Sequence, residues 1–160
     1  MKKHAILVFL GLLLMSTSAQ GQDYDVDAYI EMLRSDVKTE KIAIITEVMD
    51  FTEEESSAFW PMYREYELDF SKLGDQRIAL IKDYAAHYNE MTDEKAKELI
   101  STSIKLQEKR LSLQKKYFKS FQKVLPTIKA AKLIQLENQI NLLIDLQIAA
   151  ELPLIKEAHE

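Results

Sequence analysis

The sequence predicts an all-α protein of four antiparallel helices, in which two long central helices form an elongated hairpin with a four-helix core at one end. Three observations predict this class. The 160 residues include three glycines and three prolines, whereas sheet-rich folds need turn residues about every 8–12 positions. Apolar residues recur at helical spacings of three and four. Polar residues that can cap helices separate these periodic segments.

The first 21 residues have the three-part pattern of a secretory signal peptide. A basic start precedes the uninterrupted apolar run at residues 5–15, and a short stretch of small and polar residues follows it. As a helix this run would rise only ~17 Å, short of the ~30 Å hydrocarbon core of a bilayer. We therefore expect cleavage after Ala19 or Gly21, an exported or periplasmic location, and a single soluble helical domain at 22–160 without an integral membrane segment.

Four segments of the mature chain have helical periodicity, at about residues 28–49, 53–88, 93–125 and 127–150. Thr52 followed by Glu55 predicts a capping box at the start of the second helix, and Thr92 can cap the third. Helices two and three would each be roughly 50 Å long, against about 35 Å for the other two. Short loops make sequential helices antiparallel, so helices one and four are expected to lie beside only one end of the long hairpin.

The apolar rows of two helices lead to specific packing predictions. In helix one, Ile44 and Val48 continue the row that begins at Ile30. Helix three carries two rows roughly 100° apart, and so wide an apolar face implies contact with more than one neighbour. The second of these rows consists of Ile100, Ile104, Leu111, Phe118 and Leu125.

Polar residues interrupt the apolar rows at one level of the predicted core: Lys41, Tyr63, Gln114 and Glu137. Counting from the turns places all four ~12–17 Å from the same end of the bundle. A buried charge is costly unless it is paired and hydrogen-bonded, so we expect a buried ion pair between Lys41 and Glu137, completed by Gln114 and the Tyr63 hydroxyl. Such a layer can set the register of the helices, which is the expected role; the alternatives are a ligand-sensing layer and, given an open pocket, a catalytic Lys/Glu pair.

The hairpin beyond the four-helix core, about residues 74–104, is expected to be a bare two-helix arm. By length, neither helix one nor helix four reaches it, and two helices alone cannot cover their own apolar faces. Exposed apolar patches commonly mark binding sites, and a symmetric dimer is a common way to cover them. The arm is therefore a candidate surface for unfolded clients or for a homodimer, formed by Ile78, Ile81, Tyr84, Tyr88, Leu99 and Ile100.

Composition argues against several classes of function. The formal charge of −5 disfavours nucleic acid as a partner, and no Gly-rich phosphate loop is present. The chain has no cysteine, and its only histidines are His4, His87 and His159. Thiolate and histidine metal sites and a cysteine nucleophile are therefore disfavoured, and we expect no enzymatic activity, no metal and no cofactor.

Several segments resemble exported helical proteins. A Thr-capped turn before a long helix resembles the Spy/CpxP group of periplasmic stress proteins, whose Leu-Thr-x-x-Gln motif keeps its threonine at residues 51–55 and only its leucine at 125–129. Most of the mature chain is more similar to uncharacterised exported proteins labelled sensors of extracytoplasmic-function sigma factors, through the segments EKIAIITE, FWPMYREYE, LPTIKAAKLIQLEN and LQIAAELPL.

This resemblance implies an envelope stress protein without an assigned chemistry. One expectation is a non-enzymatic chaperone that binds unfolded, apolar clients. The alternative is a sensor or adaptor that docks on a membrane-bound signalling partner of the sigma/anti-sigma or sensor-kinase type. Resemblance to this group also implies that the protein forms a homodimer.

Overall fold

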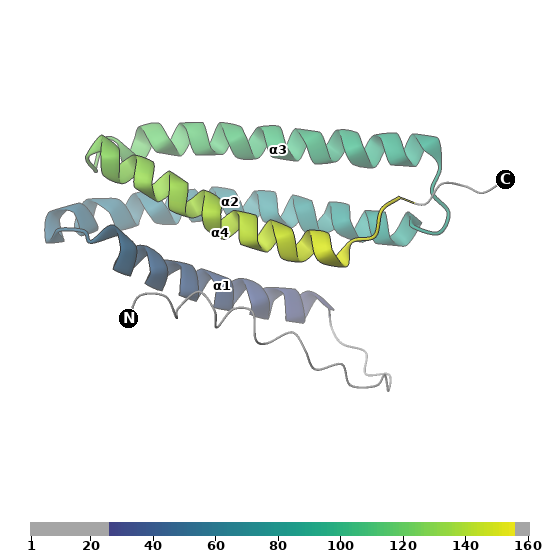
Figure 1. Cartoon of the computed structure of the whole chain (residues 1–160), viewed down its shortest axis with the longest axis horizontal. Coiled ribbons are helices and arrows are strands. Elements are labelled where there is room, and N and C mark those ends of the chain that lie inside the picture. Colours follow the sequence, from purple (N-terminus) through teal and green to yellow (C-terminus); the bar gives the residue numbers. More distant parts are fainter. Residues whose placement is uncertain (1–25, 156–160) are drawn as a thin grey trace. The chain divides into compact units, whose positions relative to one another are not determined.

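The structure, a computed structural model, describes the backbone of residues 26–155 and the side chains of residues 38–155, so the predicted signal peptide lies outside the described residues. The described chain consists of four helices: α1 (Val26–Met49), α2 (Glu53–His87), α3 (Asp93–Phe121) and α4 (Thr127–Glu151) (Figure 1). No strand occurs among these residues, and the all-α prediction is confirmed. No helix in the described part of the chain has the length and apolar content that crossing a membrane requires.

Residues 39–160 belong to one compact unit, which therefore includes the last turns of α1 together with the other three helices. Its core is mainly aromatic. Phe59, Tyr63 and Tyr66 of α2 surround Phe121 of α3, with ring centroids 5.7, 6.5 and 5.9 Å from that of Phe121. The remaining buried apolar residues of this cluster come from α1, α3, α4 and the turn between α3 and α4: Ile45, Met49, Tyr117, Leu125, Ala130 and Leu133. The predicted four-helix core at one end of the hairpin is thus present.

Local sequence accounts for the helix ends. Asp50 has a φ of 47°, a left-handed conformation that aspartate tolerates, and it ends α1. Thr52 and Glu55 form the predicted capping box, in which the Thr52 hydroxyl accepts from the Glu55 N–H and the Glu55 carboxylate accepts from the Thr52 N–H. The α3 helix ends at Phe121 rather than near Leu125, because residues 122–125 form a turn before Pro126.

The α1 helix buries a different row of residues from the one predicted. Lys41, Ile45 and Met49 are buried, whereas Ile44 and Val48 are partly exposed. A spacing of four residues places the buried three on one face. The helix is rotated toward Lys41 because the ammonium of that residue reaches carboxylates on α2 and α4.

The α4 helix and the residues after it reach further along the hairpin than predicted (Figure 1). The Asp145 carboxylate accepts hydrogen bonds from Arg77 of α2 and Arg110 of α3. Beyond the helix, the Pro153 carbonyl accepts a hydrogen bond of 2.7 Å from the Tyr84 hydroxyl. The prediction that nothing from helix four reaches the arm is therefore wrong. Asp145 lies within α4, so the helix itself already reaches Arg77 at the start of the arm. The non-helical residues after Glu151 then carry the chain on toward Tyr84, by up to ~3.3 Å each against 1.5 Å in a helix.

The arm consequently leaves less apolar surface exposed than predicted. Leu99 is buried, and the α2 members of the candidate surface are half-buried: Ile78, Ile81, Tyr84 and Tyr88. Only Ile100 is exposed, and it continues into Ile104 and Leu111, the other exposed members of the second apolar row of α3. The expectation that this row is covered by a neighbouring helix is wrong for these three residues, although Phe118 and Leu125 of the same row are half-buried and buried.

Asp145→Asn should make folding less dependent on pH. Burial raises the pKa of Asp145, but hydrogen bonds from Arg77 and Arg110 outweigh it and lower the pKa below its ordinary value. A carboxyl with a lowered folded pKa stabilises the fold above its unfolded pKa of about 3.9, and this contribution is lost as pH falls through the folded pKa. Urea titrations between about pH 5 and pH 2 should therefore show a smaller loss of unfolding free energy for the variant.

The control for this measurement is Glu65→Gln, which removes an exposed carboxyl from α2. Its pH dependence should stay close to that of the wild-type protein. If Asp145→Asn and the wild-type protein lose stability in parallel over the acidic range, the bridge between α2, α3 and α4 does not contribute as described.

Candidate functional site

The ammonium group of Lys41 lies inside the compact unit, where three helices meet. Its side chain is only 6% exposed. The Lys41 Nζ is 2.6 Å from Oε1 of Glu67 on α2 and 2.8 Å from Oε2 of Glu137 on α4. Because Glu137 is fully buried, its charge depends on these partners instead of on water.

Two tyrosine hydroxyls complete the hydrogen bonding of Glu137. The Tyr63 hydroxyl donates to Oε1 at 2.7 Å, and the Tyr66 hydroxyl donates to Oε2 at 3.0 Å. Burial and then the charge of Glu137 raise the pKa of both tyrosines far above the ordinary value. Both hydroxyls therefore stay protonated and act as hydrogen-bond donors.

Aromatic rings enclose the ammonium on its remaining sides. The Lys41 Nζ lies 5.8, 5.6 and 5.2 Å from the ring centroids of Tyr63, Tyr66 and Phe70, within the range of cation–π attraction. These three residues and Glu67 follow one another at i, i+3, i+4 and i+7, which places them on one face of α2. We name the set that surrounds the Lys41 ammonium the ammonium cage: Tyr63, Tyr66, Glu67, Phe70 and Glu137.

The structure brings together three of the four residues predicted for the polar layer: Lys41, Tyr63 and Glu137. Gln114 lies outside this cluster, and its amide donates to Asn138 on α4. It was expected between two buried rows of helix three, but the second of those rows is largely exposed in this region. Gln114 therefore lies at the edge of the core, where α3 meets α4.

Two members of this cluster, Tyr66 and Glu67, were not among the residues predicted for the polar layer. Both lie within one turn of Tyr63, at i+3 and i+4, which are the positions that share a helix face. This spacing could have identified them as further partners for Lys41.

A further polar residue lies one turn along α4 from the cage. Asn141 is 4% exposed, and within the described part of the chain its Nδ2 has no hydrogen-bond partner. Glu137 and Asn141 are separated by four residues, so they share the buried face of α4. The inward face of α4 is therefore polar over two consecutive turns.

Exposed aliphatic side chains form two rows beside the contact between α3 and α4, which the Gln114–Asn138 hydrogen bond marks. The contact residue is Gln114 on α3 and Asn138 on α4. At 100° per residue, each row is rotated by roughly 40–80° about the helix axis from its contact residue, away from the buried residues of the same helix. Both rows therefore lie on the same side of this contact, and we name them together the α3/α4 face. Its members are 51–68% exposed: Ile100, Ile104, Leu111, Leu142 and Leu146.

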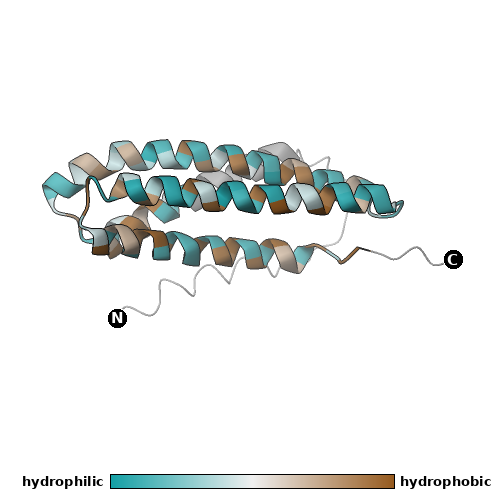
Figure 2. Cartoon of the chain, turned by 90° about the horizontal axis from the view of Figure 1, so that it is seen from above, coloured by the Kyte–Doolittle hydropathy of each residue, from teal (hydrophilic) through white to brown (hydrophobic). Residues whose placement is uncertain are grey.

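The exposed side of α4 carries no charge over most of its length. Between Lys132 and Glu151 the charged residues of this helix are Glu137, which is buried, and Asp145, which is paired with two arginines. Figure 2 shows hydrophobic residues recurring along α4, the helix that leads to the C-terminus. This pattern is unusual for a solvent-facing helix and typical of the centre of an interface, where charged residues are depleted.

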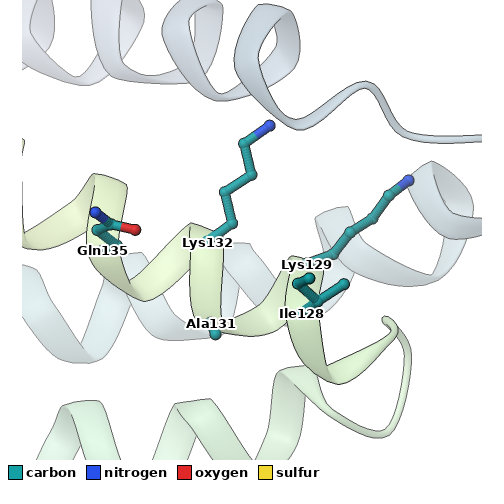
Figure 3. A pocket seen from close by; sticks show the side chains of 5 residues that line it. All are labelled: Ile128, Lys129, Ala131, Lys132 and Gln135. Atoms are coloured by element: carbon teal, nitrogen blue, oxygen red, sulfur yellow. The ribbon is translucent and has the colours of Figure 1, made fainter.

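A shallow depression of about 330 Å³ lies at the start of α4 (Figure 3). Its lining includes Lys129 and Lys132, whose side chains extend away from α4 in this view. Lys129 donates to the Asp50 carbonyl and pairs with Glu55, and Lys132 donates to the Val48 carbonyl. Both lysines thus connect α4 to the turn between α1 and α2. Among the described residues, no group of three or more His, Asp or Glu side chains is placed to hold a metal ion.

Comparison with known proteins assigns no family to this chain. No protein-family model matches it, and searches of curated proteins and of solved structures found no match. The features of the described chain that bear on function are therefore the ammonium cage and the α3/α4 face.

Glu137→Ala should lower the free energy of unfolding by roughly 3–5 kcal/mol, because it removes one partner of a buried charge pair and two acceptors of tyrosine hydroxyls. Glu65→Ala, at an exposed position of the neighbouring helix, should stay within about 0.5 kcal/mol of the wild-type protein. Urea unfolding monitored by far-UV circular dichroism measures both. A loss below about 1 kcal/mol for Glu137→Ala would contradict the buried pair.

Proposed function

We propose that the protein is an exported, non-enzymatic envelope stress protein that binds apolar segments of client proteins through its α3/α4 face. The observation that carries this proposal is the set of five large aliphatic side chains, each more than half exposed, on one side of two packed helices. Contiguous apolar patches on soluble proteins commonly mark interaction sites. The export step follows from the signal-peptide pattern of the sequence.

The surroundings of the face support weak and reversible binding. Exposed charged residues of both signs border the α3 row on its outer side: Lys97, Glu108 and Lys115. Aliphatic contact is non-directional and roughly proportional to the area removed from water, so it accepts clients of different sequence. The charged border keeps the free protein soluble.

The buried polar groups support binding over catalysis. The carboxylates of the cage are engaged by Lys41, and the two tyrosines remain protonated donors. General acid–base chemistry needs a group whose pKa lies near the operating pH and which reaches the substrate. The described groups of the cage are instead arranged to hold a charge inside the fold.

Leu146→Ser should weaken suppression of aggregation several-fold, because it places a hydroxyl in the middle of the α3/α4 face. The measurement is light scattering by a chemically denatured client diluted into buffer with substoichiometric amounts of the protein. Leu68→Ser is the matched control, since Leu68 of α2 and Leu146 are 61% and 66% exposed. An equal effect of both variants, or no effect of either, would count against the face as the client site.

A second candidate is a sensor or adaptor that docks on one membrane-bound signalling partner. The uncharged outer side of α4 favours it, because defined interfaces are depleted in charge at their centre. The two candidates predict different stoichiometry. An adaptor should saturate at one partner per protein and ignore unrelated unfolded chains, whereas a chaperone should bind many such chains weakly.

A further inference from the structure

The ammonium cage is built without α1. Tyr63, Tyr66, Glu67 and Phe70 lie on α2, and Glu137 lies on α4. The α1 helix contributes only the ammonium that occupies the cage. The residues that surround the ammonium and the residue that supplies it therefore belong to different segments of the chain.

The chemistry of the cage is selective for a primary ammonium group. Two carboxylates accept from Lys41 at 2.6 and 2.8 Å, and three rings present their π-systems to the cation. An ammonium has three N–H donors on a compact charge, which suits two carboxylate acceptors within aromatic walls. Removing the ammonium would leave Glu67 and the buried Glu137 without the cation that both now contact, so emptying the cage without a replacement is unfavourable.

The attachment of α1 to the rest of the unit is narrow. Over residues 39–49 the buried residues are Lys41, Ile45 and Met49, and every other residue is exposed. Lys41 is thus the polar member of a single buried row, while Lys132 of α4 also donates to the Val48 carbonyl near the end of α1. On the other side of the contact, Asn141 adds a buried amide whose Nδ2 has no partner within the described part of the chain. A hydrogen-bond donor that Lys41 does not engage, the Asn141 amide, therefore lies one turn from the cage on α4.

We propose that the ammonium cage is a binding site for primary alkylammonium groups, that Lys41 is its internal ligand, and that a lysine side chain of a partner segment can take the place of Lys41. This inference goes beyond the proposed function and uses a different part of the molecule. It assigns the partner a chemistry: a lysine flanked by apolar residues that can replace the Lys41, Ile45 and Met49 row.

The first test replaces the Lys41 side chain by a free molecule of the same shape. Lys41→Ala deletes the atoms beyond Cβ, and n-propylammonium has the same three carbons and one nitrogen. We expect Lys41→Ala to melt at a lower temperature than the wild-type protein. We expect n-propylammonium chloride to raise the melting temperature of the variant by several degrees and to leave that of the wild-type protein unchanged.

Three solutes and one variant serve as controls. Sodium chloride at equal ionic strength tests screening, n-propanol tests shape without charge, and tetramethylammonium tests charge without N–H donors. The methionine of Lys41→Met fills the space of the lysine side chain with apolar atoms, so n-propylammonium should not stabilise this variant. Should Lys41→Ala be unfolded on its own, recovery of its helical circular dichroism signal by n-propylammonium is the readout. A response no larger than that to n-propanol or sodium chloride, or an equal response of Lys41→Met, would overturn the site.

The second test addresses the partner segment. A fluorescent peptide with the sequence of residues 39–50 should bind full-length Lys41→Ala, and n-propylammonium should compete with it. The same peptide with methionine at the lysine position should bind at least an order of magnitude more weakly. Equal binding of the two peptides, or no binding of the lysine peptide, would overturn the exchange of Lys41 for another lysine. The n-propylammonium and peptide tests do not depend on client binding by the α3/α4 face. The proposed function can therefore fail while the cage proposal holds, and the reverse.

Discussion

The burial of the Lys41 ammonium against Glu67 and Glu137 is the constraint on which the rest of this structure depends. A charge removed from water needs partners at hydrogen-bond distance, and here those partners come from two other helices. The requirement sets the rotation of α1 and the level at which α2 and α4 face each other. Buried ion pairs often contribute more to the uniqueness of a packing arrangement than to net stability, and this pair is positioned to select one register.

The aromatic core follows from the same constraint. Tyrosines occupy positions 63 and 66 because their rings fill the space between helices while their hydroxyls reach Glu137. Phenylalanine occupies positions 59, 70 and 121, where rings contact other rings or the Lys41 cation but meet no carboxylate that needs a donor. The two tyrosines thus both fill the apolar core with their rings and donate the hydrogen bonds that the buried Glu137 carboxylate needs.

Ala130 and Leu133 make the inward face of α4 apolar near its start, but the next two turns depart from the usual arrangement of a surface helix. There the inward face holds Glu137 and Asn141, while the outward face carries Leu142 and Leu146. Such an arrangement is costly in an isolated protein, because it buries polar groups and exposes apolar area.

The sequence by itself determined the helices, their capping turns and the pairing of Lys41 with Glu137, because these depend on local periodicity, on side chains that reach their own backbone, and on isolated charges within apolar rows. Tertiary structure decided the rest. A wide apolar face permits several rotations of a helix about its axis, so only packing selected Ile45 over Ile44, left the second row of α3 exposed and moved Gln114 to the edge of the core. The spacing of Tyr66 and Glu67 from Tyr63 places them on one face of α2. Their contacts, like that of Pro153, still depend on distances between elements, which only the tertiary structure sets.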